Sequence, residues 1–161
     1  MPNPKPRVYV ETTIPSAYYT GRKNPEAATL SRTTRRWWDK AVTSCELVTS
    51  RAVLDELAQG RSDYVEWRLA LLEGLPVLEA DETVRATARI YIQQKLMPAD
   101  PLGDALHLAL ASHDECDLLV TWNYRHLANR TKLERIRRVN RELGLFIPVI
   151  VSPGILLGGD V

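Results

Sequence analysis

The chain has 161 residues, of which 45% are hydrophobic and 25% are charged, and its formal net charge is +1. This length and this composition exclude a disordered chain, and we expect one globular domain over residues 1–161. The nearly balanced charge also excludes a global electrostatic attraction to nucleic acid, so any such attraction must be local.

Five short apolar runs predict β-strands along the chain. They are RVYVE (7–11), CELVT (45–49), PVLE (76–79), DLLVT (117–121) and FIPVIV (146–151). Pro148 cannot donate to a β-ladder, so we expect the last strand at an edge of the sheet. The runs alternate with segments of helical period, which is typical of a parallel sheet with helices on both faces.

The helix signals between these strands are capping residues and apolar stripes. Asn24 and Pro25 predict the start of a helix that carries Trp37 and Trp38, which we expect to fill the core or a dimer interface. Further predicted helices are 51–58, ended by Gly60; one capped by Asp63; one capped by Asp81; 104–112, which is apolar on nearly all sides; and 131–143, ended by Gly144.

Four polar residues lie where such a sheet forms its functional crevice, beyond the carboxyl ends of its strands. Glu11 ends the first strand and Asn123 follows the fourth, and these strands are neighbours if the order is 3-2-1-4-5. Glu56 lies on the helix after the second strand, and Asp104 begins the helix before the fourth. We therefore expect three carboxylates and one amide to converge.

Carboxylates in such a cluster repel one another unless a hard cation with oxygen ligands lies between them. Mg²⁺ or Mn²⁺ suits these ligands better than zinc does, and such an ion can activate water for phosphodiester hydrolysis. The chain contains no G-x-S-x-G, Walker or dinucleotide-binding motif that would favour another chemistry.

Each candidate also has a purely structural interpretation. Asp104 is well placed as a helix N-cap, and Asn123 as a turn residue. His107, one turn after Asp104, is better explained as a hydrogen-bonded core histidine than as a ligand. His126 and Asn129 are better explained as residues that shape the turn after the fourth strand.

Four segments of the chain resemble, in order, the signatures of the PIN domain family. They are RVYVETTIPSAYY, SRAVLDELAQG, DALHLALA and CDLLVTWNYRHLAN, and the likeness extends over residues 7–157. It is nearest to bacterial PIN proteins of the VapC type, the toxins of toxin–antitoxin pairs. The resemblance implies a three-layer fold with a parallel sheet in the order 3-2-1-4-5, a ribonuclease dependent on Mg²⁺ or Mn²⁺, and a homodimer.

Carried over position by position, the resemblance places the family's catalytic and metal-binding residues at Glu11, Glu56, Asp104 and Asn123. It places supporting hydroxyl residues at Thr12 and Thr121. The family usually has Asp where this chain has Glu11, and often Asp where it has Asn123. These departures imply a site with one metal ion or a weaker affinity for it.

Two alternatives to a ribonuclease remain open: a PIN-like module that binds RNA or protein without cutting it, and a phosphotransfer receiver. The receiver would need a strand-end Asp–Lys pairing, which is not evident.

Cys45 and Cys116 lie far apart outside any CxxC spacing, which excludes a disulfide framework and predicts a cytoplasmic protein. The sequence has no secretory signal and no apolar run of membrane-spanning length, and the partners we expect are RNA, a second copy and an antitoxin.

Overall fold

The computed structural model describes residues 4–97, 103–123 and 129–158. Its sheet contains β1 (Arg7–Val10), β2 (Glu46–Ser50), β3 (Val77–Leu78), β4 (Leu118–Val120) and β5 (Val149–Val151). All neighbouring strands are parallel, and their order is β3-β2-β1-β4-β5. The predicted parallel sheet and its order are confirmed.

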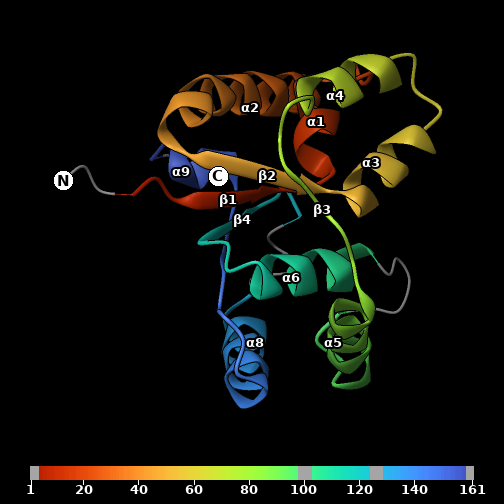
Figure 1. Ribbon diagram of the computed structural model, residues 1–161. Helices are drawn as coiled ribbons and strands as arrows, with labels where there is room; N and C mark the ends of the chain where they lie inside the picture. Colours follow the sequence, from red (N-terminus) through yellow and green to blue (C-terminus); the bar gives the residue numbers. More distant parts are fainter. Residues whose placement is uncertain (1–3, 98–102, 124–128, 159–161) are drawn as a thin grey trace.

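Helices cover both faces of this sheet, so the three-layer architecture is confirmed as well. On one side lie α1 (Thr13–Tyr18), α2 (Pro25–Ser44) and α4 (Val65–Leu71), and on the other α5 (Glu82–Gln93), α6 (Gly103–His113) and α8 (Arg130–Leu143) (Figure 1). Helix α3 (Arg51–Ala58) follows β2 directly, and α9 (Pro153–Leu156) follows β5.

The central position of β1 determines where the candidate site forms. Val8, Tyr9 and Val10 have no exposed surface, because β2 and β4 flank the strand and helices cover both faces. In the register of the sheet, Val10 of β1 lies beside Val120 of β4. The residues that follow these two strands, Glu11 and Thr121, therefore emerge next to each other.

Most predicted helix ends agree with the structure, but α6 begins at Gly103, so Asp104 lies inside its first turn and is not the N-cap that the sequence also allowed. The side chains of Asn24 and Asp81 accept the backbone N–H groups of the third residues after them, as N-caps do, and Gly144 ends α8 with a φ of 70°. The prediction that Asp63 caps the next helix was wrong. Helix α4 begins at Val65 after an uncapped Tyr64, because the Ser62 hydroxyl accepts the Tyr64 N–H and forms the preceding turn.

The most apolar predicted helix is confirmed as a buried one. Seven residues of α6 are buried, and the helix leads into β4 with Asp104 in its first turn. Trp37 and Trp38 lie in the core, which is one of the two places expected for them. Strand β5 is at the edge of the sheet, but it begins after Pro148, and Val149 remains 55% exposed.

Helices α1 and α9 were not anticipated from the sequence. Each is short, and each begins shortly after the carboxyl end of a strand. Within the three described stretches of the chain, no helix combines the length and the apolar character that crossing a bilayer requires.

Candidate functional site

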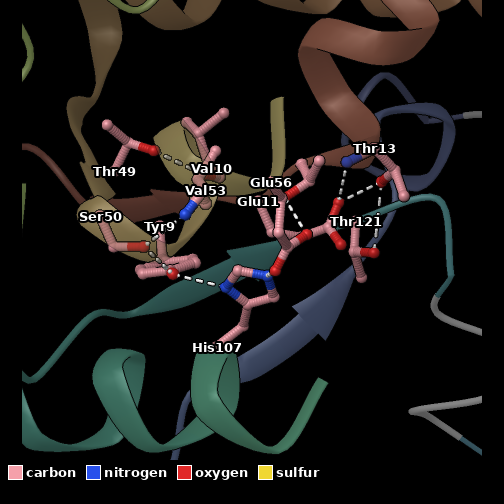
Figure 2. A network of polar contacts seen from close by, with 11 residues as sticks. Tyr9, Val10, Glu11, Thr13, Thr49, Ser50, Val53, Glu56, His107 and Thr121 are labelled. Atoms are coloured by element: carbon pink, nitrogen blue, oxygen red, sulfur yellow. Dashed lines mark hydrogen bonds and ion pairs between the residues drawn. The ribbon is translucent and has the colours of Figure 1, made fainter. Parts of the chain in front are cut away.

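Glu11 is the most deeply buried acid at the carboxyl edge of the sheet. Its side chain is 3% exposed, and its Oε1 accepts the backbone N–H and the hydroxyl of Thr13 at the start of α1 (Figure 2). Burial raises the pKa of Glu11, and the negative charge of Asp104 adds to this effect. The positive charge of His107 and the two bonds from Thr13 oppose it without cancelling it.

Hydrogen bonds of Thr13 also link the end of β4 to the end of β1. Its Oγ1 accepts the backbone N–H of Trp122 at 2.8 Å and lies 3.4 Å from Oγ1 of Thr121. The Thr121 hydroxyl oxygen accepts the backbone N–H of Asn123 at 2.9 Å. Hydroxyl groups thus bring the predicted residues Glu11, Thr121 and Asn123 into one connected set.

Glu56 reaches the same edge from α3, and two contacts fix its carboxylate. Its Oε2 accepts the Thr12 hydroxyl at 2.7 Å, and its Oε1 lies 3.0 Å from Nε2 of His107. Although partial burial acts to raise the pKa of Glu56, the contacts with His107 and Thr12 together lower it below its ordinary value. Glu56 is therefore held as a carboxylate.

His107 connects this carboxylate to the interior of the sheet. The imidazole is buried, and its Nδ1 lies 2.7 Å from the Tyr9 hydroxyl, which lies 2.7 Å from Oγ of Ser50 (Figure 2). The Ser50 hydroxyl also accepts the Val53 N–H and is the N-cap of α3, the helix that carries Glu56. A chain of polar contacts thus runs from the start of α3 through β1 and α6 back to α3.

The charge of His107 depends on opposing influences. Burial disfavours the imidazolium, but the contact with Glu56 and the charges of Glu11 and Asp104 favour it, and the pKa of His107 is raised above its ordinary value. The contact between Nε2 and Glu56 is an ion pair that lacks the direction of a good hydrogen bond. The acidic side chains around His107 thus favour its protonated form.

Gly103 leaves the space that Glu56 occupies. A Cβ atom at this position would lie 2.7 Å from Oε1 of Glu56 and 3.7 Å from Nε2 of His107. Real Cβ atoms do not approach an oxygen that closely. The first residue of α6 must therefore be glycine if Glu56 and His107 are to meet as they do.

The structure brings the four predicted residues to one edge of the sheet, but their contacts with one another differ. Asp104 affects the pKa values of both Glu11 and His107, so it lies within electrostatic reach of each. Asn123 is tied to this edge through its backbone N–H. In the described part of the chain, no three acidic, histidine or cysteine side chains are grouped closely enough to hold a metal ion by themselves.

The sequence did not identify Thr13, Tyr9 or Ser50 as part of this site. Thr13 follows two residues that were singled out, but nothing in the sequence shows which of two adjacent threonines faces Glu11. His107 was interpreted as a hydrogen-bonded core histidine, and it is buried and bonded to Tyr9, but it also contacts Glu56. His126 lies outside the described residues.

The donor chemistry of this edge suits a hard divalent cation. The side chains that meet here offer carboxylate and hydroxyl oxygens, and the raised pKa of the buried Glu11 shows that its negative charge lacks full compensation. Magnesium commonly binds through one or two carboxylates, with water and substrate phosphate as its other ligands. A preformed group of three protein ligands is therefore not required.

A family model described as PIN domain matches residues 8–133 of the chain. The matched segment runs from β1 into the first turn of α8 and includes every residue of the site described above. No curated protein matches the chain in a sequence comparison.

Proposed function

The chain belongs to the PIN domain family, a family with a nuclease-type fold, and from this premise we propose that it is a metal-dependent endoribonuclease. Its reaction would be hydrolysis of RNA phosphodiester bonds at the carboxyl edge of the sheet. The catalytic and metal-binding residues of this proposal are Glu11, Glu56, Asp104 and Asn123, supported by Thr12 and Thr121.

One observation carries the proposal: a nearly buried carboxylate, Glu11, lies at the end of the central strand within reach of other charged groups. Such burial is unfavourable for a residue with only a structural role, because each ionised group loses hydration. Catalytic sites commonly contain buried carboxylates despite this unfavourable free energy, because the carboxylate takes part in the reaction.

Mg²⁺ or Mn²⁺ is the cofactor we propose, held by Glu11, Glu56 and Asp104 with the amide oxygen of Asn123. When bound, it would lower the pKa of a water molecule and neutralise charge on the phosphoryl group. The protein's own groups hold the ligands in place. Thr12 and His107 fix Glu56, and Thr13 fixes Glu11, so that little reorganisation is needed when RNA arrives.

The biological setting we propose is the toxin of a toxin–antitoxin pair that acts as a homodimer in the cytoplasm. This setting is supported by the resemblance to VapC-type proteins. Its test is joint expression with any small DNA-binding protein that the neighbouring reading frame encodes. A complex that suppresses RNA cleavage supports the pairing, and free activity beside that protein contradicts it.

The test of the nuclease itself is cleavage of structured and single-stranded RNAs in the presence of Mg²⁺, Mn²⁺ or a chelator. Wild type is compared with Asp104→Asn and Glu56→Gln. We expect cleavage that needs metal and falls by about 10²–10³-fold in each variant, since each removes a carboxylate proposed to hold the cation that stabilises the reacting phosphate.

Asp55→Asn is the matched control, because Asp55 is exposed and precedes Glu56 on α3. It should cleave as wild type does. Metal-independent cleavage, or equal losses in Asp55→Asn and Glu56→Gln, would contradict the assigned site.

A second candidate is a PIN-fold module that binds RNA or protein without cutting it. The absence of three closely grouped metal-binding side chains among the described residues favours it. Wild type that binds RNA but cuts none of the RNAs with either metal would establish this alternative.

A further inference from the structure

A cavity of about 530 Å³ lies beside the acidic site, between α1, the start of α2 and α4. Its wall includes Thr12 and Thr13, whose hydroxyl groups bind Glu56 and Glu11. The cavity therefore lies beside the two threonines that bind these carboxylates, although Glu11 and Glu56 do not themselves line it. Its volume is within the range of about 300–1,000 Å³ that small-molecule sites occupy.

Two cations line this cavity, Arg22 before α2 and Arg68 on α4. The Arg68 guanidinium donates to the carbonyl oxygen of Tyr19 at 2.7 and 3.0 Å. Among the described residues, no carboxylate forms an ion pair with either arginine. Both positive charges are thus available to an anion, although the exposed Glu26 on α2 also lines the cavity and opposes it.

Aromatic side chains continue from the wall of the cavity to the surface. A Cβ atom at Gly21, which lines the cavity, would lie 3.7 Å from the ring of Tyr64. The Trp67 ring centroid is 5.5 Å from that of Tyr64 and 5.6 Å from that of Tyr19. Two tyrosines therefore fix the Trp67 indole from the side, yet the residue is 57% exposed.

A rigid, exposed indole beside two available cations is the arrangement by which proteins bind single-stranded nucleic acid, through base stacking and phosphate contacts. A duplex would not fit, because its bases are stacked on one another and cannot enter a cavity. An interface with a second copy would also cover Trp67, but it would not explain two arginines in a cavity whose wall includes the threonines that bind Glu56 and Glu11.

We propose that this cavity holds one unpaired nucleotide of the RNA next to the cleaved bond, and that the adjacent base stacks on Trp67. Arg22 and Arg68 would contact the phosphates of this segment. The inference rests on the proposed function, since it identifies where that substrate lies. It makes Trp67 and Arg22 determinants of the preference for unpaired RNA.

The test is binding of a fluorescently labelled single-stranded RNA, measured by anisotropy with chelator present. Anisotropy reports binding whether or not the protein cuts RNA, and intact RNA is checked on a gel after each titration, so a failure of the nuclease proposal does not affect the measurement. We expect Trp67→Ala to weaken binding about tenfold or more, and Trp67→Phe to retain most of it. The same RNA annealed to its complement should bind more weakly than the single strand.

Charge variants at two residues that line the cavity should change RNA affinity in opposite directions. Arg22→Gln should weaken binding and reduce the slope of log K against log salt by about 1, whereas Glu26→Gln should strengthen binding. Phe146→Ala and Arg85→Gln remove an exposed aromatic group and an exposed cation elsewhere, and both should bind as wild type does.

Two results would overturn the inference. One is unchanged RNA affinity in Trp67→Ala and Arg22→Gln. The other is a Trp67→Ala variant that changes from dimer to monomer in size-exclusion chromatography and binds RNA as wild type does when the dimer is restored at high concentration. That second result would assign Trp67 to a protein interface.

Discussion

Nε2 of His107 lies 3.0 Å from Oε1 of Glu56, and this pair joins the core of the protein to its acidic edge. On its other side, His107 contacts the buried hydroxyl of Tyr9. A residue with few exposed atoms thus positions a carboxylate that is 39% exposed at its side chain. Changes at His107 should therefore affect both stability and the site.

His107→Ala should lower the free energy of unfolding by about 1–3 kcal/mol, because the buried Tyr9 hydroxyl and Glu56 both lose a partner. Urea denaturation with chelator measures this. His107→Gln should lose less stability, since its side-chain amide can still form a hydrogen bond. The matched control is His113→Ala on the same helix, where a partly exposed histidine contacts Thr87 at 2.8 Å. An equal or larger loss in the control would contradict the positioning role.

The raised pKa of His107 predicts a pH dependence of stability. The charged and titratable groups that face His107 are Glu56, Glu11, Asp104 and Tyr9. Because its folded pKa is above the ordinary 6.5, its contribution to stability is complete below that pH and is lost as pH rises through the raised value. Metal-free wild type should thus become less stable above pH 6.5.

His107→Gln should show a smaller decline over that range, and denaturation midpoints at several pH values make the comparison. The lowered pKa of Glu56 affects stability in a different, acidic pH range. Its contribution to stability is present above pH 4.5 and is lost as the pH falls through the lower pKa of the folded state. Identical slopes for wild type and His107→Gln above pH 6.5 would remove His107 as the cause.

Gly103→Ala should impair the site more than the fold. The new Cβ would lie 2.7 Å from Oε1 of Glu56, the end of a flexible and half-exposed side chain that can move away. We expect stability to change by less than about 1 kcal/mol while RNA cleavage falls at least tenfold, as misplacement of a catalytic group predicts.

The control for Gly103→Ala is a double variant with Glu56→Gln. If the alanine acts by displacing Glu56, adding it to Glu56→Gln should cost little further activity, so the two effects are not additive. Full additivity would show that the alanine acts through another residue.

Cys116 should resist alkylation in the folded protein. Burial raises its pKa to about 12, so the reactive thiolate is rare at neutral pH, and the side chain has no exposed surface. Iodoacetamide followed by mass spectrometry should label the partly exposed Cys45 first and Cys116 only after unfolding. Labelling of Cys116 at the same rate as Cys45 in native protein would contradict this.

The sequence by itself determined the sheet and most helix ends. Short apolar runs that alternate with helical segments require a parallel sheet covered on both faces, and capping residues such as Asn24 and Asp81 act on neighbours three residues away. These signals are local, so they can be seen in a linear chain. The Asp63 prediction was wrong because a nearby serine satisfied the same kind of backbone donor.

The strand order came from the family resemblance, and the acidic positions came from the strand ends together with that resemblance, whereas tertiary structure alone decided how the side chains meet. Tyr9, Ser50, Glu56 and His107 come from β1, β2, α3 and α6, and packing of these elements brings them together. No spacing in the sequence encodes this meeting, since a shift of one residue in register would turn Tyr9 to the other face of the sheet. The cavity beside Trp67 likewise exists only because α1, α2 and α4 pack against one another.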